Sequence, residues 1–403
     1  MRFGVLSTMI GLPWAGSEEL WGQAAHVLLA GGHAVCANVA GTNGPSEPLR
    51  ALARVGAKVR RRPRTLVGRT IRRAAQRVGI GRYREMRWLR WSRPDLVLVS
   101  AGFYTDDPLV CTGCRALGIP YAIVVQAAAP DQAIDAESLM ELRDAYRHAE
   151  SVFFLSRQNR QIVEAMLDER LPHAEIFRNP FNVRPDATPP WPEPTESWRL
   201  ACVARINFFT KGQDILIELM RRPKWRERPL EIVLWGQDCG SEREARSLVQ
   251  QHGLENQVRF GGFTDDVEAI WADHHGFVLP TRFEGGPMVL VEAMLCGRMP
   301  IITDVGYAGE FVDDNVNGFL APEATIDAVD DALERAWQRR NEWQAIGARA
   351  AATIRQRHSL QPARDFACRL VELAGGGERG SDRQRRDDDN QATARELRRR
   401  ECA

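Results

Sequence analysis

Short apolar runs alternate with amphipathic segments along most of the chain, and this alternation predicts strands that alternate with helices. In the first half, apolar runs predict strands at 2–7, 33–39, 95–100, 121–126, 151–155 and 175–177. In the second half, they predict strands at 200–204, 230–235, 257–260, 277–279 and 300–303. Strands that are apolar on both faces are typical of parallel sheets covered by helices on both sides. The pattern therefore predicts an α/β protein built from two such sheets.

A proline-rich segment separates the two halves. Residues 180–198 contain six prolines in nineteen positions, which disfavours a helix or an interior strand and predicts a linker. The expected domains are residues 1–179 and 199–358, both Rossmann-like. A last helix is expected at 359–374, and the charged, glycine-rich tail at 375–403 is expected to be disordered. A ligand site is expected in the cleft where the carboxyl edges of the two sheets face each other.

The overall composition is that of a soluble globular protein. The 403 residues are 44% apolar and 27% charged. The N-terminus lacks the basic region and long apolar core of a signal peptide, and no apolar run reaches the length of a membrane span. The eight cysteines are scattered, mostly in apolar segments, which suits reduced thiols. We therefore expect a cytoplasmic location.

The charge is distributed unevenly. Residues 50–93 contain sixteen of the 54 Lys and Arg residues and one of the 53 acids, so the rest of the chain has a net charge of −14. Trp88 and Trp91 lie within this basic segment. It is a candidate surface for anionic lipid, a lipid phosphate or a polyanionic glycan, and it would place the protein on the inner face of the membrane. No nucleic-acid-binding motif accompanies it, and the alternative is a solvated basic face.

The stretch 277–305 combines a strand, a glycine loop and a helix. The loop and the start of the helix contain Glu284, Gly285, Gly286, Pro287 and Met288, and Glu292 lies about one turn into the helix. Unpaired backbone N–H groups at such a helix start suit an anionic or hydroxyl-rich ligand. The alternative is that the glycines only form the turn and that Glu292 is an exposed helix residue.

Two cations follow the first strand of the second half. Arg205 lies just after the strand and Lys211 opens the next helix, so both are expected at the sheet edge that carries Glu284. Fixed cations at this edge could neutralise a diphosphate, although a solvated surface pair is the alternative. In the first half, Gly16 ends the loop after the first strand, and the absence of GxGxxG argues against an NAD site.

No metal site is expected. Cys111 and Cys114 form one CTGC pair, but no second pair or suitably spaced histidines accompany them. His274 and His275 are adjacent and lack the spacing of a metal motif, so we expect structural or cleft-edge histidines.

Taken in order, these motifs resemble a known enzyme family. Arg205 with Lys211-Gly212, followed by Glu284 and Glu292 as E-x7-E, is similar to the retaining glycosyltransferases of family 4. The resemblance covers nearly the whole chain and implies the GT-B fold, in which two Rossmann-like domains face each other across a cleft. It also implies a nucleotide-diphosphate sugar as donor and no metal cofactor.

The resemblance assigns a role to each candidate residue. Arg205 and Lys211 would hold the diphosphate and stabilise the leaving group, and Glu284 would contact the donor sugar. Glu292 would hold the ribose. The remaining donor-binding residues would be Gly16, Gly262, Phe263, Gly285, Gly286, Pro287 and Met288, with the nucleobase near residues 235–237 and near Gly262 and Phe263.

Two positions depart from the family pattern. Many members carry a His after the strand that here ends at Gln126, so either the sugar is positioned differently or Gln126 makes a substitute contact. Gly286 stands where an apolar residue such as Leu is usual, and the smaller residue would either loosen the turn or enlarge the sugar pocket. Both departures concern the donor sugar more than the reaction class.

We therefore predict a retaining, metal-independent glycosyltransferase whose acceptor is a glycan or a lipid-linked molecule. Within the same fold, a nucleotide-sugar epimerase or a phosphorylase is the alternative, and no context for the pyridoxal lysine of a phosphorylase is present. A non-catalytic protein that binds a glycan or lipid is the second alternative. The sequence does not specify the sugar, the base, the acceptor, the linkage or the oligomeric state.

Overall fold

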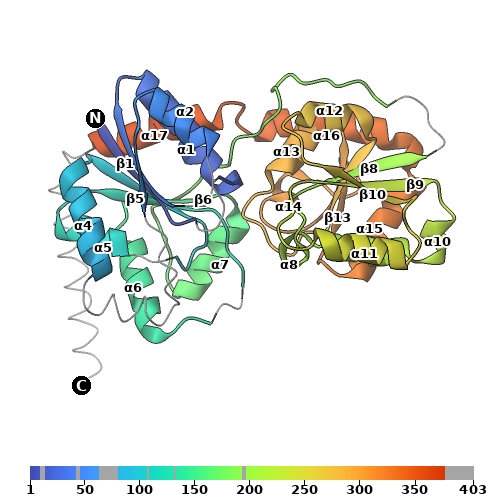
Figure 1. The fold of residues 1–403 in the computed structure, drawn as a ribbon, viewed down its shortest axis with the longest axis horizontal. Helices are drawn as coiled ribbons and strands as arrows, with labels where there is room; N and C mark the ends of the chain where they lie inside the picture. Colours follow the sequence, from blue (N-terminus) through green and yellow to red (C-terminus); the bar gives the residue numbers. More distant parts are fainter. Residues whose placement is uncertain are drawn as a thin grey trace.

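The computed structural model describes residues 1–9, 14–41, 46–62, 80–106, 109–130, 133–192 and 197–376. These residues form two α/β domains that lie side by side, each with a parallel sheet between layers of helices (Figure 1). The predicted fold class of two parallel-sheet domains is confirmed. Part of the basic segment, at 63–79, and the expected tail from 377 onward lie outside the described residues.

The N-terminal sheet has seven parallel strands in the order β3-β2-β1-β4-β5-β6-β7. Its strands are β1 (Arg2–Ser7), β2 (Ala34–Ala40), β3 (Lys58–Arg62), β4 (Leu96–Ala101), β5 (Tyr121–Val125), β6 (Val152–Phe154) and β7 (Ala174–Ile176). Phe3 of β1 lies opposite Val35 of β2 and Leu96 of β4, which fixes the register at the centre.

Helices cover both faces of this sheet and form two separate cores. They are α1 (Gly16–Ala30), α2 (Glu47–Arg54), α4 (Ile80–Ser92), α5 (Leu109–Ala116), α6 (Ala136–Arg147), α7 (Arg157–Leu167) and, from the far end of the chain, α17 (Pro362–Gly375). Helices α1, α2 and α17 share one core, and α4 to α7 share the other. Because every central strand is covered on both sides, its residues are mostly apolar, with Ser7, Asn38 and Ser100 as buried polar exceptions.

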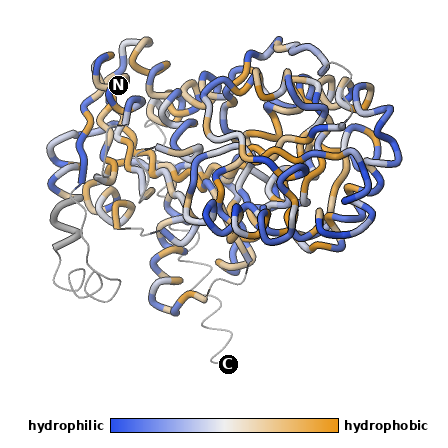
Figure 2. The backbone as a smooth tube through the Cα atoms, turned by 45° about the vertical axis from the view of Figure 1, so that its right-hand side comes forward, coloured by the Kyte–Doolittle hydropathy of each residue, from blue (hydrophilic) through white to orange (hydrophobic). Residues whose placement is uncertain are grey.

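The C-terminal sheet has six parallel strands in the order β10-β9-β8-β11-β12-β13. They are β8 (Trp198–Val203), β9 (Leu230–Trp235), β10 (Val258–Gly262), β11 (Gly276–Leu279), β12 (Met299–Thr303) and β13 (Phe319–Ala321). The helices are α8 (Phe208–Lys211), α9 (Gln213–Met220), α10 (Pro223–Arg226), α11 (Glu242–Gln251), α12 (Val267–Asp273), α13 (Met288–Leu295), α14 (Ala308–Phe311), α15 (Ile326–Gln338) and α16 (Trp343–Arg357). Figure 2 shows the hydrophobic strands inside this domain and the hydrophilic segments around it.

The chain returns to the N-terminal domain at its last described helix. After α16, which packs in the C-terminal domain, α17 lies beside α1 (Figure 1). Phe366 of α17 places its ring 5.0 Å from that of Phe153 in β6 and 5.3 Å from that of Phe177. Arg369 adds an ion pair of 2.9 Å with Glu175 in β7. The N-terminal core therefore depends on a helix supplied by the end of the described chain.

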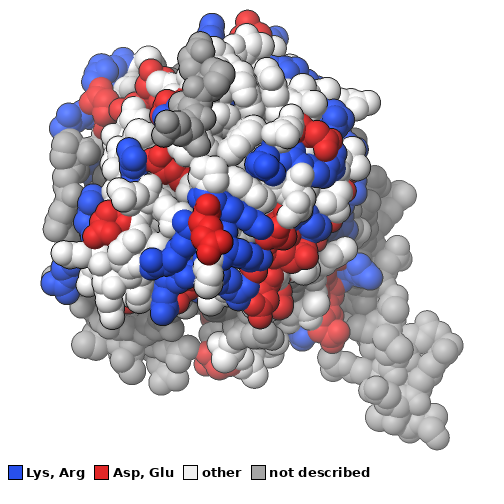
Figure 3. Space-filling model, turned by 90° about the vertical axis from the view of Figure 1, so that its right-hand side faces the viewer, with Lys and Arg blue, Asp and Glu red and all other residues white. Residues whose placement is uncertain are grey.

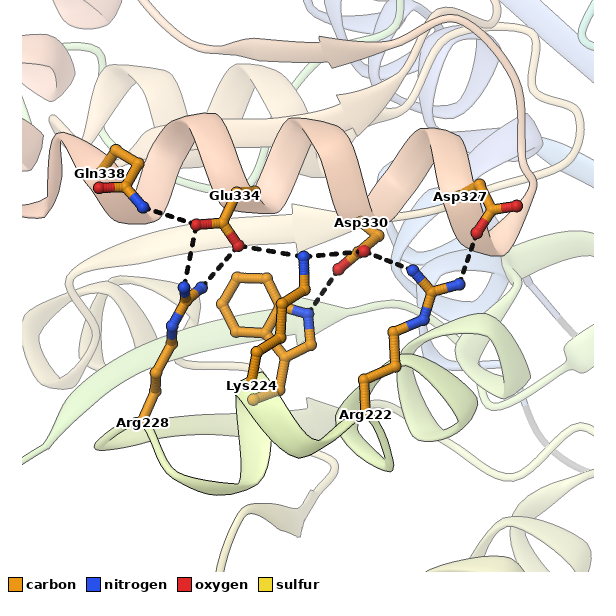
Figure 4. A network of polar contacts seen from close by, with 8 residues as sticks. Arg222, Lys224, Arg228, Asp327, Asp330, Glu334 and Gln338 are labelled. Carbon is orange, nitrogen blue, oxygen red and sulfur yellow. Dashed lines mark hydrogen bonds and ion pairs between the residues drawn. The ribbon is translucent and has the colours of Figure 1, made fainter.

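The outer face of the C-terminal domain carries interleaved charges of both signs (Figure 3). Helices α10 and α15 are joined there by a network of ion pairs and hydrogen bonds (Figure 4). Arg228 holds the pKa of Glu334 down to about 2, and the indole of Trp225 donates to Asp330 at 2.5 Å. The lowered pKa means that Glu334 stabilises the fold above its ordinary pKa, and that this contribution is lost as pH falls toward 2.

Among the described residues, no helix is both long and apolar enough to cross a membrane.

Candidate functional site

The loop after β11 leads directly into the N-terminus of α13, on the side of the domain that faces its neighbour (Figure 1). Pro287 is the N-cap residue and Met288 begins the helix, and no side chain caps the first turn. Gly285, Gly286 and Pro287 are buried, whereas Glu284 and Met288 are partly exposed. The first N–H groups of α13 are therefore available to a ligand that enters beside Glu284.

Lys211 and Glu284 form an ion pair at this helix start. Lys211 is the last residue of α8, and its Nζ contacts Oε1 of Glu284. Both side chains are only 15% exposed, so the pair is largely shielded from water. The hydroxyl of Thr281 lies 3.4 Å from the same carboxylate oxygen. The structure thus brings together two predicted residues that are 73 positions apart.

Hydrogen bonds fix the two loops that carry this pair. The hydroxyl of Thr281 and the backbone N–H of Arg282 both donate to the carbonyl of Thr210, each at 2.8 Å. Arg282 also forms an ion pair of 2.7 Å with Asp214 in α9. Gly212, with φ +69°, lies so close to the Pro280 carbonyl that a Cβ atom would overlap it. This close approach explains the glycine after Lys211.

Arg205 follows β8 at the same sheet edge, but its side chain is exposed. Within the described part of the chain, its guanidinium makes no hydrogen bond or ion pair. The Arg205 carbonyl accepts a hydrogen bond of 2.8 Å from Gln213, which fixes the backbone. Arg205 therefore lies at the same sheet edge as the Lys211–Glu284 pair without being part of it.

Glu292 lies inside α13 and is 4% exposed. Its Oε1 accepts hydrogen bonds from the backbone N–H and the side-chain amide of Asn182 in the linker, each at 3.0 Å. Burial, with a smaller contribution from the charge of Glu19 in α1, raises its pKa to about 6 against the opposing effect of the Asn182 hydrogen bonds. The alternative of an exposed helix residue is therefore wrong for Glu292, while its ribose contact stays a prediction.

The two domains touch at the predicted glycines. Gly285 lies against the carbonyl of Gln126 at the end of β5, and a Cβ atom there would overlap that oxygen. A Cβ atom on Gly16, the first residue of α1, would lie 3.1 Å from Sδ of Met288. Both predicted positions therefore lie where the carboxyl edges of the two sheets meet.

Gln126 itself is buried, with one half of its amide satisfied. Its Oε1 accepts from Asn179 at 3.1 Å, and its Nε2 has no hydrogen-bond partner among the described residues. A buried hydrogen-bond donor without a partner costs free energy of folding, and this unpaired N–H group of Gln126 lies at the domain boundary.

Tyr307 fills the space beside Gly286. A Cβ atom on Gly286 would overlap the ring of Tyr307, which is fully buried. Gly286 therefore leaves no empty volume on this side, and the tyrosine compensates for the small residue. Burial raises the pKa of Tyr307 well above its usual range, so its hydroxyl stays protonated. Nothing in the sequence predicts this contact, because Tyr307 lies in a later loop that follows β12.

Gly262 and Phe263 lie at the end of β10. Gly262 has φ +77°, and its carbonyl accepts a hydrogen bond of 2.7 Å from Gly236. Phe263 is 58% exposed. Both residues lie on the carboxyl edge of the sheet, as expected, and their contact with a nucleobase stays a prediction.

An open cavity of 480 Å³ in the N-terminal domain was not predicted from the sequence. It lies between the end of β4, the loop after β5 and one face of α7, and its lining is mostly apolar. The residues that line it are Tyr104, Ala129, Pro130, Gln161, Ile162, Ala165 and Met166. Only the apolar face of α7 is visible in the sequence pattern.

The described residues contain no group of three or more His, Cys, Asp or Glu side chains placed to hold a metal ion. His274 is buried, with Nδ1 2.7 Å from the Ile270 carbonyl. Nδ1 of His275 accepts from the backbone N–H of Arg199 at 3.0 Å, and burial lowers its pKa to about 4. Cys111 and Cys114 are buried in α5. These histidines thus have structural partners.

Sequence comparison finds relatives for the C-terminal part of the chain. Residues 183–353 match the model of the family described as glycosyl transferases group 1. The chain is 28% identical over 200 residues to D-inositol 3-phosphate glycosyltransferase of Saccharomonospora viridis, covering 47% of this chain and 46% of that protein. It is 25% identical over 125 residues to poly(ribitol-phosphate) alpha-N-acetylglucosaminyltransferase of Staphylococcus aureus, covering 31% and 25%. The chain spans about a quarter to two fifths of the curated relatives it matches first.

Structural comparison covers nearly the whole chain. HepE of Anabaena, solved in complex with UDP, superposes with a TM-score of 0.72 at 17% identity, covering 92% of this chain and 100% of that one. Sucrose-phosphate synthase of Thermosynechococcus elongatus gives 0.72 at 16% identity, covering 94% and 100%. The fold is GT-B, as predicted.

Proposed function

We propose that the protein is a retaining glycosyltransferase that moves a sugar from a nucleotide-diphosphate sugar to an acceptor hydroxyl. The observation that carries this proposal is the shielded Lys211–Glu284 pair at the uncapped N-terminus of α13. A cation and a helix start at one point suit a diphosphate, and an adjacent carboxylate suits sugar hydroxyls. The match to group 1 glycosyl transferases over residues 183–353 supports the same reading.

In this proposal, Lys211 and Glu284 neutralise each other until the donor binds. Lys211 then pairs with the diphosphate, and Glu284 accepts hydrogen bonds from the donor sugar. Arg205 adds charge from the exposed side, and the N–H groups of Met288 and its neighbour complete the anion site. As the bond to the sugar breaks, this preorganised positive charge stabilises the departing diphosphate, so the proposed transfer needs no metal ion.

We further propose that the acceptor binds against the N-terminal domain and is a glycan or a lipid-linked molecule. The 480 Å³ cavity has the size and apolar lining of a ligand pocket. The open Nε2 of Gln126 is a hydrogen-bond donor for a sugar hydroxyl at the domain boundary.

A basic surface on the N-terminal domain supports a proposed membrane contact. Arg87, Arg90 and Arg93 are exposed in and after α4. Trp91 is 60% exposed, and the ammonium of Lys58 lies 5.6 Å from its ring centre. Exposed basic residues around a tryptophan suit the headgroup region of an anionic bilayer. We propose that the protein acts in the cytoplasm at such a surface.

The test is product analysis with donors labelled in the sugar. A panel of UDP-, GDP- and ADP-sugars is first screened by calorimetry, and the donor that binds is incubated with and without acceptor extracts. Transfer with retained anomeric configuration, read by NMR, supports the proposal. Conversion of the labelled sugar in the absence of acceptor would instead identify an epimerase, and failure of every nucleotide sugar to bind would point to a non-catalytic protein.

A further inference from the structure

Two phenylalanine rings come from the segments that carry the Lys211–Glu284 pair, and one of them is largely exposed. Phe209, in α8, is 74% exposed, the largest exposed fraction of any large apolar side chain in the described part of the chain. Phe283 is half-buried and directly precedes Glu284. Their ring centres are 5.7 Å apart in an edge-to-face arrangement. Exposed aromatic rings at a candidate site can serve as a contact surface for a ligand.

The backbone that presents these rings is fixed. Arg282 donates from its guanidinium to the carbonyl of Phe208 and from its backbone N–H to the carbonyl of Thr210. The ion pair between Arg282 and Asp214 adds a tie to α9. The exposure of Phe209 is therefore held in place by contacts on both loops, and binding to it requires little ordering of the backbone.

We propose that Phe209 and Phe283 form a stacking surface for a pyranose ring of the acceptor, which makes the acceptor a glycan at this point. The proposal rests on the proposed function. One face of a pyranose ring presents C–H groups, which pack against an aromatic face while the hydroxyls stay in water. Lys211 and Arg282, the cations nearest to these rings in the sequence, are already paired with Glu284 and Asp214. The exposed surface of the rings is itself apolar, so it suits a neutral ring rather than an anion.

The exposure assigns the rings to the acceptor rather than to the donor. Lys211 and Glu284, which are proposed to hold the donor, are 15% exposed, whereas Phe209 is 74% exposed. A donor sugar held against Glu284 would be enclosed, while a polymer acceptor continues out of the site into solvent. Phe209 and Phe283 belong to the C-terminal domain, so an acceptor held mainly against the N-terminal domain would meet them with its part just outside the reacting sugar.

The experiment uses the full chain and cellotetraose, a neutral oligosaccharide with flat ring faces. Saturation-transfer NMR, with irradiation of aromatic protons, compares the wild type with Phe209→Ala, Phe209→Trp and the matched exposed control Val316→Ala. We expect wild type, Phe209→Trp and Val316→Ala to bind alike, and Phe209→Ala to bind about tenfold more weakly. Because Phe209 is exposed, none of these variants should lose its fold.

Calorimetry with UDP, GDP and ADP on the same variants separates this inference from the proposed function. Unchanged nucleotide binding in Phe209→Ala, with lost cellotetraose binding, supports the stacking surface. Wild-type cellotetraose binding in Phe209→Ala overturns it, whatever nucleotide binds. A saturation signal from 1-octanol that requires Phe209, with none from cellotetraose, overturns it in favour of an apolar chain. If no nucleotide binds the wild type, the proposed function fails. The cellotetraose measurements on the same variants still decide whether the stacking surface exists.

Discussion

The carboxyl edges of the two sheets have the same architecture but carry different chemistry. At the C-terminal edge, Lys211 is paired with Glu284, while the exposed guanidinium of Arg205 makes no hydrogen bond or ion pair within the described residues. At the N-terminal edge, Gln126 keeps an open donor and an apolar cavity of 480 Å³ lies nearby. An edge with a preorganised ion pair suits transfer chemistry on one kind of nucleotide sugar. An edge with an unpaired hydrogen-bond donor suits a ligand that supplies the missing acceptor.

Sequence similarity follows the same division. The family model matches residues 183–353, which lie almost entirely in the linker and C-terminal domain, while structural similarity extends over 92% of the chain. The family model thus covers the half of the chain that contains the proposed donor site, while the similarity of fold covers both halves.

The largest expected effect comes from Lys211→Ala. Loss of this cation should lower kcat by about 100- to 1,000-fold, because the developing charge on the diphosphate loses a preorganised partner. Gln126→Ala, at the other edge, should instead raise the KM for the acceptor or change the sugar preference. Steady-state kinetics on both variants, with circular dichroism as the folding control, checks this. Equal losses of kcat in the two variants would contradict the proposal that Lys211 acts on the leaving diphosphate and Gln126 on acceptor binding.

Gly285→Ala is expected to disturb the contact between the two edges. The new Cβ atom would overlap the carbonyl of Gln126, so the domains must shift apart at a cost of about 1–3 kcal/mol. Small-angle scattering should show a larger radius, and turnover should fall by at least about tenfold, which corresponds to 1.4 kcal/mol. Gly31→Ala is the matched control, because a Cβ atom there makes only ordinary contacts at 3.5 Å. An unchanged scattering curve for Gly285→Ala would contradict the close contact.

Filling the N-terminal cavity should affect the acceptor alone. Ala165→Phe places a ring among the lining residues of α7 and should raise the KM for the acceptor about fivefold, with the affinity for the donor unchanged. Competition assays with donor and acceptor measured separately check this. Met140→Ala, at a 63% exposed position on α6, serves as the control. A change in the affinity for the nucleotide sugar would contradict the proposal that the cavity binds only the acceptor.

Each domain buries one glutamate in the first helix after a central strand, and the two should differ in their pH dependence. Burial raises the pKa of Glu18 in α1 to about 7 and that of Glu292 in α13 to about 6. The folded state therefore keeps protons that the unfolded chain has lost. The free energy of unfolding should fall as pH rises from about 4.5 to 7 for Glu18, and from about 4.5 to 6 for Glu292.

Replacing either glutamate with glutamine should remove that residue's contribution to the decline in the free energy of unfolding. The contribution is about 2 kcal/mol for Glu292 and somewhat more for Glu18. Denaturant titrations between pH 4.5 and 8 on Glu18→Gln and Glu292→Gln measure it. Glu255→Gln, on the exposed surface, is the control. Because Glu19 raises the pKa of Glu292, Glu19→Gln should also shift the decline for Glu292 to lower pH. A pH profile identical to that of the wild type in both buried variants would contradict the cause assigned here.

The fold class could be predicted from the sequence because the central strands are mostly apolar. The strand predicted at 2–7 is β1, and the strand predicted at 277–279 is the last three residues of β11. Strand β3 was not predicted, since its sequence KVRRR resembles a solvated basic surface and only its edge position makes a strand possible. Strand β13 was also not predicted.

The candidate site also has a part that could be predicted from the sequence and a part that could not. The loop and helix around Glu284 could be recognised from local spacing, and the structure joins Glu284 to Lys211 as expected of residues on one sheet edge. The partners of the glycines could not be predicted. Gly285 meets Gln126 from the other domain, and Gly286 meets Tyr307 from a later loop. Such contacts depend on how distant segments pack, which no local pattern encodes.

The return of α17 to the N-terminal domain has a consequence for the order in which the chain acquires its structure during synthesis. The rings of Phe153 and Phe177 are covered by Phe366, which the ribosome adds some two hundred residues later. Domains usually become compact in the order in which they are made. Here the first domain to emerge waits for the last helix, so the second domain can be complete while an apolar face of the first is still open to chaperones.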